Sequence, residues 1–164
     1  RKRFSGLLEP TNRLELLLEL KDDGLCRLER LEQAVCHHEL REQLESLALA
    51  LYACELVDCL TPEGHPLPRL FRLLTVLLEH LTQQRATPVD RRFFEINLLN
   101  ILGYRPLLDA AGLQPLQLCL KTGSFGKVSF SASELDAAAR LLDHEISSHL
   151  GRALKSLTFL ERVM

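Results

Sequence analysis

The stretch that most constrains the fold runs from Thr87 to Pro106 and carries the start and stop signals of a helix. Thr87 offers a side-chain cap, Pro88 suits the first helical position, and Asp90 places a negative charge near the positive end of the helix dipole. Gly103 can adopt the left-handed conformation that ends a helix, and Pro106 prevents its continuation. Apolar residues occur on almost every side between these signals, so the sequence predicts the central helix of an all-helical core.

Amphipathic patterns predict two helices before this stretch and one long helix after it. The first covers residues 36–60 and the second covers residues 68–83. Their apolar stripes are Leu40, Leu44, Leu47, Leu51 and Cys54 in the first, and Leu70, Phe71, Leu74, Leu77, Leu78 and Leu81 in the second. The last helix begins after a capping-box pattern at Ser131 and Glu134, and Gly151 interrupts it.

The N-terminal part follows a strand pattern instead. Leucines alternate with charged residues over 12–20, which is the period of a half-buried strand, and residues 21–24 form a turn before a second strand over 25–31. Two strands alone are marginally stable, and the chain does not begin with Met, so we expect an incomplete view of a longer protein. Two further short strands are predicted at 116–120 and 127–130. The fold class is therefore mainly α, with a small β segment before a helical bundle.

Composition narrows the classes of function. The formal net charge of −2 means that nucleic-acid binding would need a local cationic patch, and no apolar run is long enough to cross a membrane. Five cysteines at irregular spacing indicate reduced thiols in a cytoplasmic protein and form no metal-ligand pattern. No nucleophile or phosphate-loop motif occurs, and the carboxylates fall on predicted helix exteriors, so we expect neither an enzyme nor a bound metal.

Two groups of cations are candidate binding sites. The first surrounds the strand segment, and its members are Arg1, Lys2, Arg3, Arg13, Arg27 and Arg30. A basic arm of this kind is suited to DNA phosphates, although nearby acidic residues nearly balance it and a solvated chain end is an equally good explanation.

The second group is Arg91 and Arg92, at the N-terminal end of the predicted central helix. Arginines there could hold an acidic peptide that ends in an apolar side chain. The alternative, which the residues alone favour, is that both arginines form ion pairs with Asp90, Glu95 or a neighbouring helix.

Three motifs occur in family order and together resemble the RecO family of bacterial recombination mediators. They are Gly6-Leu7-Leu8-Glu9-Pro10 leading into Leu14-Glu15-Leu16, Arg92-Phe93-Phe94-Glu95 followed by Leu98-Leu99 and Leu102-Gly103-Tyr104, and His149-Leu150-Gly151-Arg152-Ala153-Leu154-Lys155-Ser156 with Phe159-Leu160. The resemblance implies that residues 1–34 are the end of an oligonucleotide-binding (OB) barrel, and that residues 35–164 form the family's C-terminal helical domain. It also implies a cytoplasmic, nucleoid-associated protein.

The resemblance further implies the activity and the partners. RecO-like proteins bind single- and double-stranded DNA, anneal strands, and work with RecR to load RecA onto DNA coated by single-stranded-DNA-binding protein. By position, Arg92 matches the family arginine implicated in holding the acidic tail of that protein. The family often binds zinc through four cysteines, but the insert that carries them is absent between Asp109 and Ser133, so we expect no zinc and a segment missing there. The alternative function is a helical protein-interaction adaptor that does not bind DNA.

Overall fold

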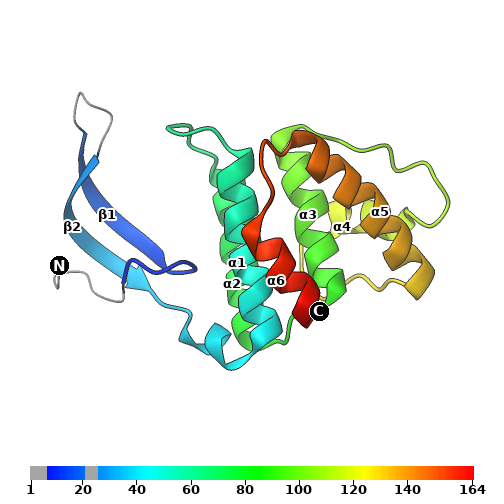
Figure 1. Ribbon diagram of the computed structural model, residues 1–164, viewed down its shortest axis with the longest axis horizontal. Helices are drawn as coiled ribbons and strands as arrows, with labels where there is room; N and C mark the ends of the chain where they lie inside the picture. Colours follow the sequence, from blue (N-terminus) through cyan, green and yellow to red (C-terminus); the bar gives the residue numbers. More distant parts are fainter. Residues whose placement is uncertain (1–6, 21–25) are drawn as a thin grey trace.

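The computed structural model describes residues 7–20 and 26–164, and shows a β-hairpin followed by a helical domain (Figure 1). The hairpin consists of β1 (Arg13–Leu20) and β2 (Cys26–Val35), paired antiparallel. The helices are the 3-10 helix η1 (His38–Glu42), α1 (Leu44–Leu60), α2 (Pro68–Gln83), α3 (Pro88–Leu102), α4 (Gln114–Thr122), α5 (Ala132–His149) and α6 (Lys155–Val163). The predicted fold class, mainly α with a small β segment, is confirmed.

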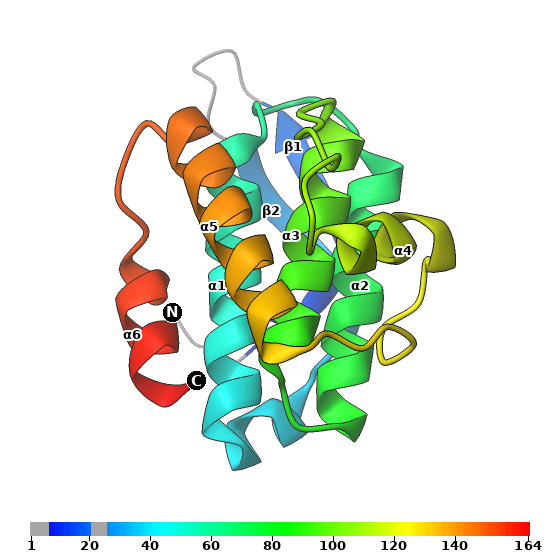
Figure 2. The same cartoon turned by 90° about the vertical axis from the view of Figure 1, so that its right-hand side faces the viewer.

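Helix α3 is the centre of the helical domain, as the sequence predicts. Thr87 and Asp90 form a reciprocal capping box at its start, and Gly103 ends it with φ 86° in the left-handed region. The helix packs against α1, α2, α4 and α5, and Figure 2 shows it between α5 on one side and α2 with α4 on the other. Contact on several sides explains why this short helix carries apolar residues around most of its circumference.

The bounds of α2 agree with the prediction, and α5 starts at the predicted Ser131 capping box. The chain then turns at Gly151 into α6, which packs along α1. Glu55 of α1 fixes the start of α6, because its carboxylate accepts hydrogen bonds from the backbone N–H groups of Lys155 at 3.1 Å and Ser156 at 2.8 Å. The N–H groups at the start of α6, which have no partner within their own helix, are therefore capped by a side chain from a different helix.

The prediction of one continuous helix over 36–60 is wrong. Val35 still belongs to β2, residues His38–Glu42 form the short helix η1, and Gln43 is extended with φ −128° and ψ 109°. The new start at Leu44 changes which residues face inward, so Leu44 is 52% exposed while Leu49 and Leu56 are fully buried. Helix α1 packs against α2, α3 and α6, and this contact with three partners decides the buried face.

The two short strands predicted after α3 are also wrong. Residues 116–120 lie in α4, and residues 127–130 form no regular secondary structure. Leucines at every second position favour a strand, but Leu116 and Cys119 are fully buried against the core while Leu118 is 50% exposed. That spacing is the helical one, and Pro115 fits the first turn because no hydrogen bond is required of its nitrogen there.

Strand β1 agrees with the prediction, whereas β2 continues to Val35, beyond the predicted end at residue 31. The leucines of the hairpin are also less buried than expected. Leu16 is 37% exposed and Leu18 is 45% exposed, because β1 and β2 form a two-stranded sheet in the part of the chain that the structure describes. Two irregularities in the ladder strengthen the twist of the hairpin. The predicted turn at 21–24 lies outside the described residues, and the predicted domain boundary after residue 34 stays a prediction.

Candidate functional sites

Arg91 and Arg92 lie in the first turn of α3 and share one carboxylate, that of Glu95. The spacings of four and three residues bring both guanidinium groups over Glu95 on the same side of the helix. Arg91 Nε donates to Glu95 Oε1 at 2.8 Å, and Arg92 Nη1 donates to Glu95 Oε2 at 2.7 Å. Glu95 is fully buried, and the side chains of Arg91 and Arg92 are only 11% and 8% exposed.

Two residues from other helices complete this arginine cluster. Asp143 of α5 accepts through Oδ1 from Arg91 Nη2 at 3.1 Å and from Arg92 Nη1 at 2.7 Å. Tyr52 of α1 donates its hydroxyl to Glu95 at 2.6 Å, and the guanidinium of Arg91 lies over its ring, 5.1 Å from the centroid. The cluster therefore joins α1, α3 and α5 through two positive and two negative charges.

Two members of the cluster, Arg91 and Tyr52, have pKa values above their ordinary range. Burial alone would lower the pKa of Arg91, but the Glu95 carboxylate, with contributions from Tyr52 and Asp143, raises it above its ordinary value. Burial and the neighbouring negative charge of Glu95 raise the pKa of Tyr52 well above its usual range, so the hydroxyl stays protonated and donates. The buried Glu95 carboxylate accepts three hydrogen bonds, one from Tyr52 and one from each arginine, which compensates for its removal from water.

Not every guanidinium nitrogen of the cluster is used in a hydrogen bond within the described residues. Within the described residues, every side-chain nitrogen or oxygen that is shielded from solvent has a hydrogen-bond partner. The hydrogen bonds of Arg92 all use Nη1, and those of Arg91 use Nε and Nη2. Arg92 Nη2 and Arg91 Nη1 therefore reach solvent. On the outer side of the cluster, the side chain of Asp143 is 52% exposed.

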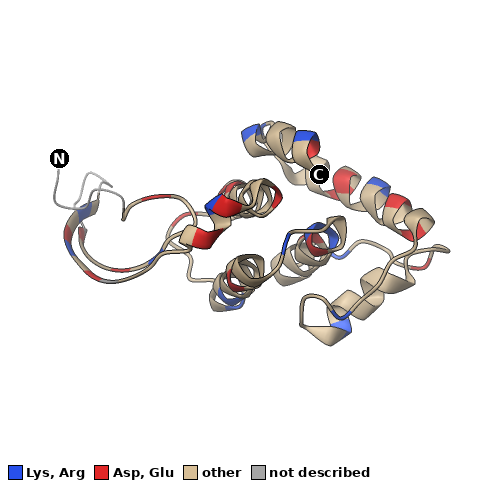
Figure 3. Cartoon of the chain, turned by 90° about the horizontal axis from the view of Figure 1, so that it is seen from below, with Lys and Arg blue, Asp and Glu red and all other residues tan. Residues whose placement is uncertain are grey.

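The cations predicted to bind DNA fall into two sets. Arg1, Lys2 and Arg3 lie outside the described residues. Arg13 and Arg27 lie on the hairpin and form weak, exposed ion pairs: Arg13 with Glu79 of α2 at 3.7 Å, and Arg27 with Glu19 at 4.0 Å. Figure 3 shows cationic and acidic residues interspersed along the chain rather than separated into regions of one sign.

The structure places two carboxylates differently from the prediction that they lie on helix exteriors. Besides Glu95, Asp90 is buried, and its Oδ1 lies 3.0 Å from His80 Nε2 while Oδ2 accepts from the backbone N–H of Thr87. These polar contacts with the start of the helix and with His80 compensate for the burial of the Asp90 carboxylate. Both carboxylates are thus held by structural partners.

No group of three or more potential metal ligands comes together in the described ranges 7–20 and 26–164. The five cysteines are free thiols, and Cys119 is the buried one. Over the same residues, the helices are too short or too polar to cross a lipid bilayer.

These observations define a class of protein: a helical domain with an attached β-hairpin, whose candidate sites are cationic side chains and not a cleft of reactive groups. Residues 41–113 match the family described as Recombination protein O C terminal. The chain is 40% identical to the DNA repair protein RecO of Pelobacter propionicus, in an alignment that covers 99% of this chain and 80% of the relative. The corresponding proteins of Geobacter sulfurreducens and Myxococcus xanthus are 39% and 31% identical, and 81% of each is covered. The chain belongs to the RecO family of DNA repair proteins.

The alignments also show a difference in length. The match to the Pelobacter propionicus protein extends over 198 residues, whereas this chain has 164, so the relative carries residues inside the aligned region that have no counterpart here. The sequence predicts a missing segment between Asp109 and Ser133, and its position stays a prediction. No solved structure matches this chain.

Proposed function

We propose that this protein is a mediator of DNA repair and homologous recombination that acts without catalysis and, in this chain, without a metal or other cofactor. It binds single- and double-stranded DNA, anneals complementary strands, and helps RecR load RecA onto DNA coated by single-stranded-DNA-binding protein. Its place of action is the bacterial nucleoid. The observation that carries the proposal is the 40% identity to a DNA repair protein RecO over nearly the whole chain.

The hairpin supports DNA contact through its cations. The side chain of Arg13 is 38% exposed and that of Arg27 is 70% exposed, and their partners Glu79 and Glu19 are at least half exposed. Exposed ion pairs contribute only about 0–1 kcal/mol, so a DNA phosphate can replace either carboxylate at small cost. Arg1, Lys2 and Arg3 extend the same basic segment in the sequence.

The arginine cluster of α3 supports the second proposed contact, with the acidic tail of the single-stranded-DNA-binding protein. Arg91 and Arg92 already hold two carboxylates in fixed geometry, and the outer one, from Asp143, is exposed. A carboxylate of the tail would bind the solvent-facing N–H groups or take the place of Asp143. Charge-assisted hydrogen bonds from arginine are the strong kind that such recognition needs.

A salt titration tests the DNA proposal. Binding of a labelled single strand, followed by fluorescence anisotropy, should weaken steeply between low and physiological salt, because phosphate contacts release counterions. Addition of the protein should also accelerate annealing of two complementary labelled strands. A protein that leaves the strands unbound at every salt concentration would contradict the proposal and favour the adaptor, which binds a protein partner only.

A pair of variants tests the tail proposal, with a synthetic acidic peptide that ends in an apolar residue as the probe. Arg92→Ala should weaken binding by about 1.5–3 kcal/mol through loss of a hydrogen bond to a charged group. Asp143→Asn should strengthen it, because the competing carboxylate is gone while the fold is kept. Circular dichroism checks that Arg92→Ala is folded. Equal peptide affinity in both variants and the parent protein would rule out the cluster as the tail site.

A further inference from the structure

The two faces of the hairpin differ in chemistry. Side chains alternate along β1, and each cross-strand partner lies on the same face as the residue that it opposes. Arg13 pairs with Val35, Leu17 with Arg30, and Glu19 with Arg27. One face therefore carries three arginines: Arg13, Arg27 and Arg30. The opposite face carries Leu14, Leu16, Leu18, Leu28 and Leu31.

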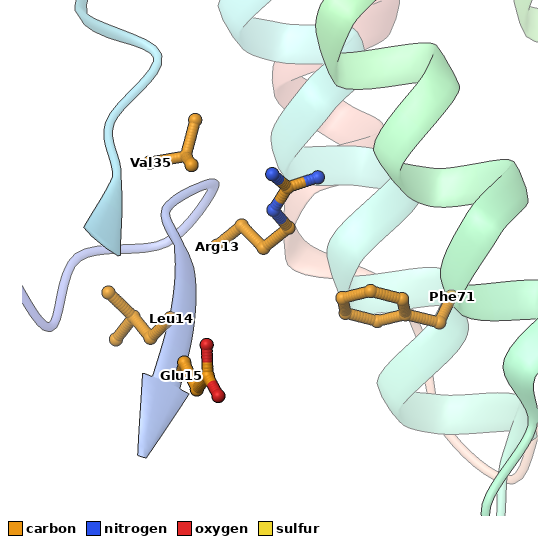
Figure 4. A pocket seen from close by; sticks show the side chains of 5 residues that line it. All are labelled: Arg13, Leu14, Glu15, Val35 and Phe71. Carbon is orange, nitrogen blue, oxygen red and sulfur yellow. The ribbon is translucent and has the colours of Figure 1, made fainter. Parts of the chain in front are cut away.

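The arginine-bearing face looks toward α2. Arg13 reaches across to Glu79 of that helix, and in Figure 4 Arg13 and Glu15 point toward the helices while Leu14 lies on the other side of β1. A cavity of about 330 Å³ lies between hairpin and helix, lined by Arg13, Leu14, Glu15, Val35 and Phe71. This volume is at the lower end of the range for small-ligand sites.

Phe71 projects from α2 into this space (Figure 4) and is 60% exposed. The sequence pattern places it on the buried stripe of the helix, which is wrong: neighbouring Leu70 is only 2% exposed and points into the core. Phe93, Phe94 and Phe125 are buried. The exposed ring of Phe71 is therefore not explained by packing within the described part of the chain.

We propose that this cavity is a binding site for an unpaired DNA base, which stacks on the ring of Phe71 while its phosphate contacts Arg13. The proposal rests on the DNA binding proposed above and assigns it a place. Stacking on an aromatic side chain beside a cationic track is the general mode of single-strand binding. A base in a duplex is already stacked on both sides, so the site selects single strands.

The charges in the cavity fix the orientation of the strand. Glu15 lines the cavity and repels a phosphate, whereas Arg13 lines it and attracts one. The sugar-phosphate backbone therefore runs on the side of Arg13, with the base turned toward Phe71. Arg27 and Arg30 lie farther along the same face, in exposed ion pairs with Glu19 and Glu32 that a phosphate can replace at small cost.

A single tryptophan reports directly on the stacking. The chain contains no tryptophan, so Phe71→Trp introduces the one indole, at an exposed position that tolerates it. Addition of a short oligothymidine should quench its fluorescence as a base stacks on the ring. The control is Leu107→Trp, in the loop between α3 and α4, where the native side chain is 82% exposed and does not line the cavity. Its emission should not change.

Affinity measurements complete the test. Phe71→Ala should weaken binding of the oligothymidine by about fivefold to a hundredfold, while Leu107→Ala should leave it unchanged. If the oligonucleotide binds but Phe71→Trp is not quenched and Phe71→Ala binds normally, the site is wrong and the proposed DNA binding stands. If the parent protein does not bind the oligonucleotide at all, the proposed function itself fails. If the Phe71→Trp variant without DNA already emits like a buried indole, another part of the protein covers this position, and that result would also overturn the site.

Discussion

The buried carboxylate of Glu95 makes a strong prediction about stability. Glu95→Ala would leave Arg91 and Arg92 with one exposed counter-charge, Asp143, and would remove the acceptor of the Tyr52 hydroxyl. Breaking a buried ion pair by removing one partner costs about 3–5 kcal/mol, because the other charge stays buried without compensation. We therefore expect Glu95→Ala to lower the free energy of unfolding by about 3–5 kcal/mol.

This loss can be measured by thermal and urea unfolding, with the helical circular dichroism signal as the readout. For a domain of this size 1 kcal/mol corresponds to about 2–4 °C, so the melting temperature should fall by about 6–20 °C. The urea midpoint should fall with little change in the slope, since the surface exposed on unfolding is nearly the same.

Two matched variants separate charge from packing. Asp143→Ala removes the other carboxylate of the cluster, but that side chain is 52% exposed, so its loss should cost no more than about 1 kcal/mol. Glu95→Gln keeps an acceptor for Tyr52 and removes the charge. Its loss of unfolding free energy should therefore lie between those of Glu95→Ala and Asp143→Ala. If Glu95→Ala costs no more than Asp143→Ala, the reasoning from burial is wrong.

Three further predictions concern other parts of the fold. Thr87→Ala removes the side-chain cap of α3 and should cost about 1 kcal/mol in urea unfolding. Burial alone would raise the pKa of Glu55, but hydrogen bonds from Ser156 and its neighbour at the start of α6 lower it below the ordinary carboxyl value. Its contribution to stability is therefore complete above the ordinary pKa and is lost as the pH falls below it, so Glu55→Gln should flatten the pH dependence of the melting temperature in the acid range. Burial raises the pKa of Cys119 to about 12, so this thiol should react with a disulfide reagent at neutral pH far more slowly than the exposed Cys26, as counted by mass spectrometry.

Local signals in the sequence are enough to predict α2, α3 and the start of α5. The bounds of α2 and α3 and the start of α5 depend on Pro68, the Thr87 cap, Gly103 and the Ser131 capping box, and these interactions lie within a few residues of each other. The errors arise where distant contacts decide. The helix predicted over 36–60 is interrupted at Gln43, where the backbone is extended. Residues 116–120 form part of α4 although their leucines alternate as in a strand, because α4 packs on α3.

The same limit applies to the exposed side chains. Phe71 follows Leu70 in an apolar run, and its position about 100° farther around the helix takes it out of the core and toward the hairpin. The sequence contains no sign of that neighbour, because the hairpin and α2 are separated by α1 in the chain. A site that lies between two elements distant in the sequence can be found only from the structure.

The arginine cluster shows why one residue can support two interpretations that the sequence cannot separate. Glu95 lies three and four residues from the arginines, so its ion pairs could be predicted, whereas Tyr52 and Asp143 come from α1 and α5 and could not. In the structure the inner carboxylate, Glu95, is fully buried and hydrogen-bonds to both guanidinium groups, while the outer one, Asp143, is half exposed. An ion-pair role and a binding role for Arg92 are therefore compatible: Glu95 holds the arginine in place, and Asp143 occupies the position for which an acidic ligand would compete. Stability should then respond mainly to Glu95, and affinity for an acidic peptide mainly to Asp143.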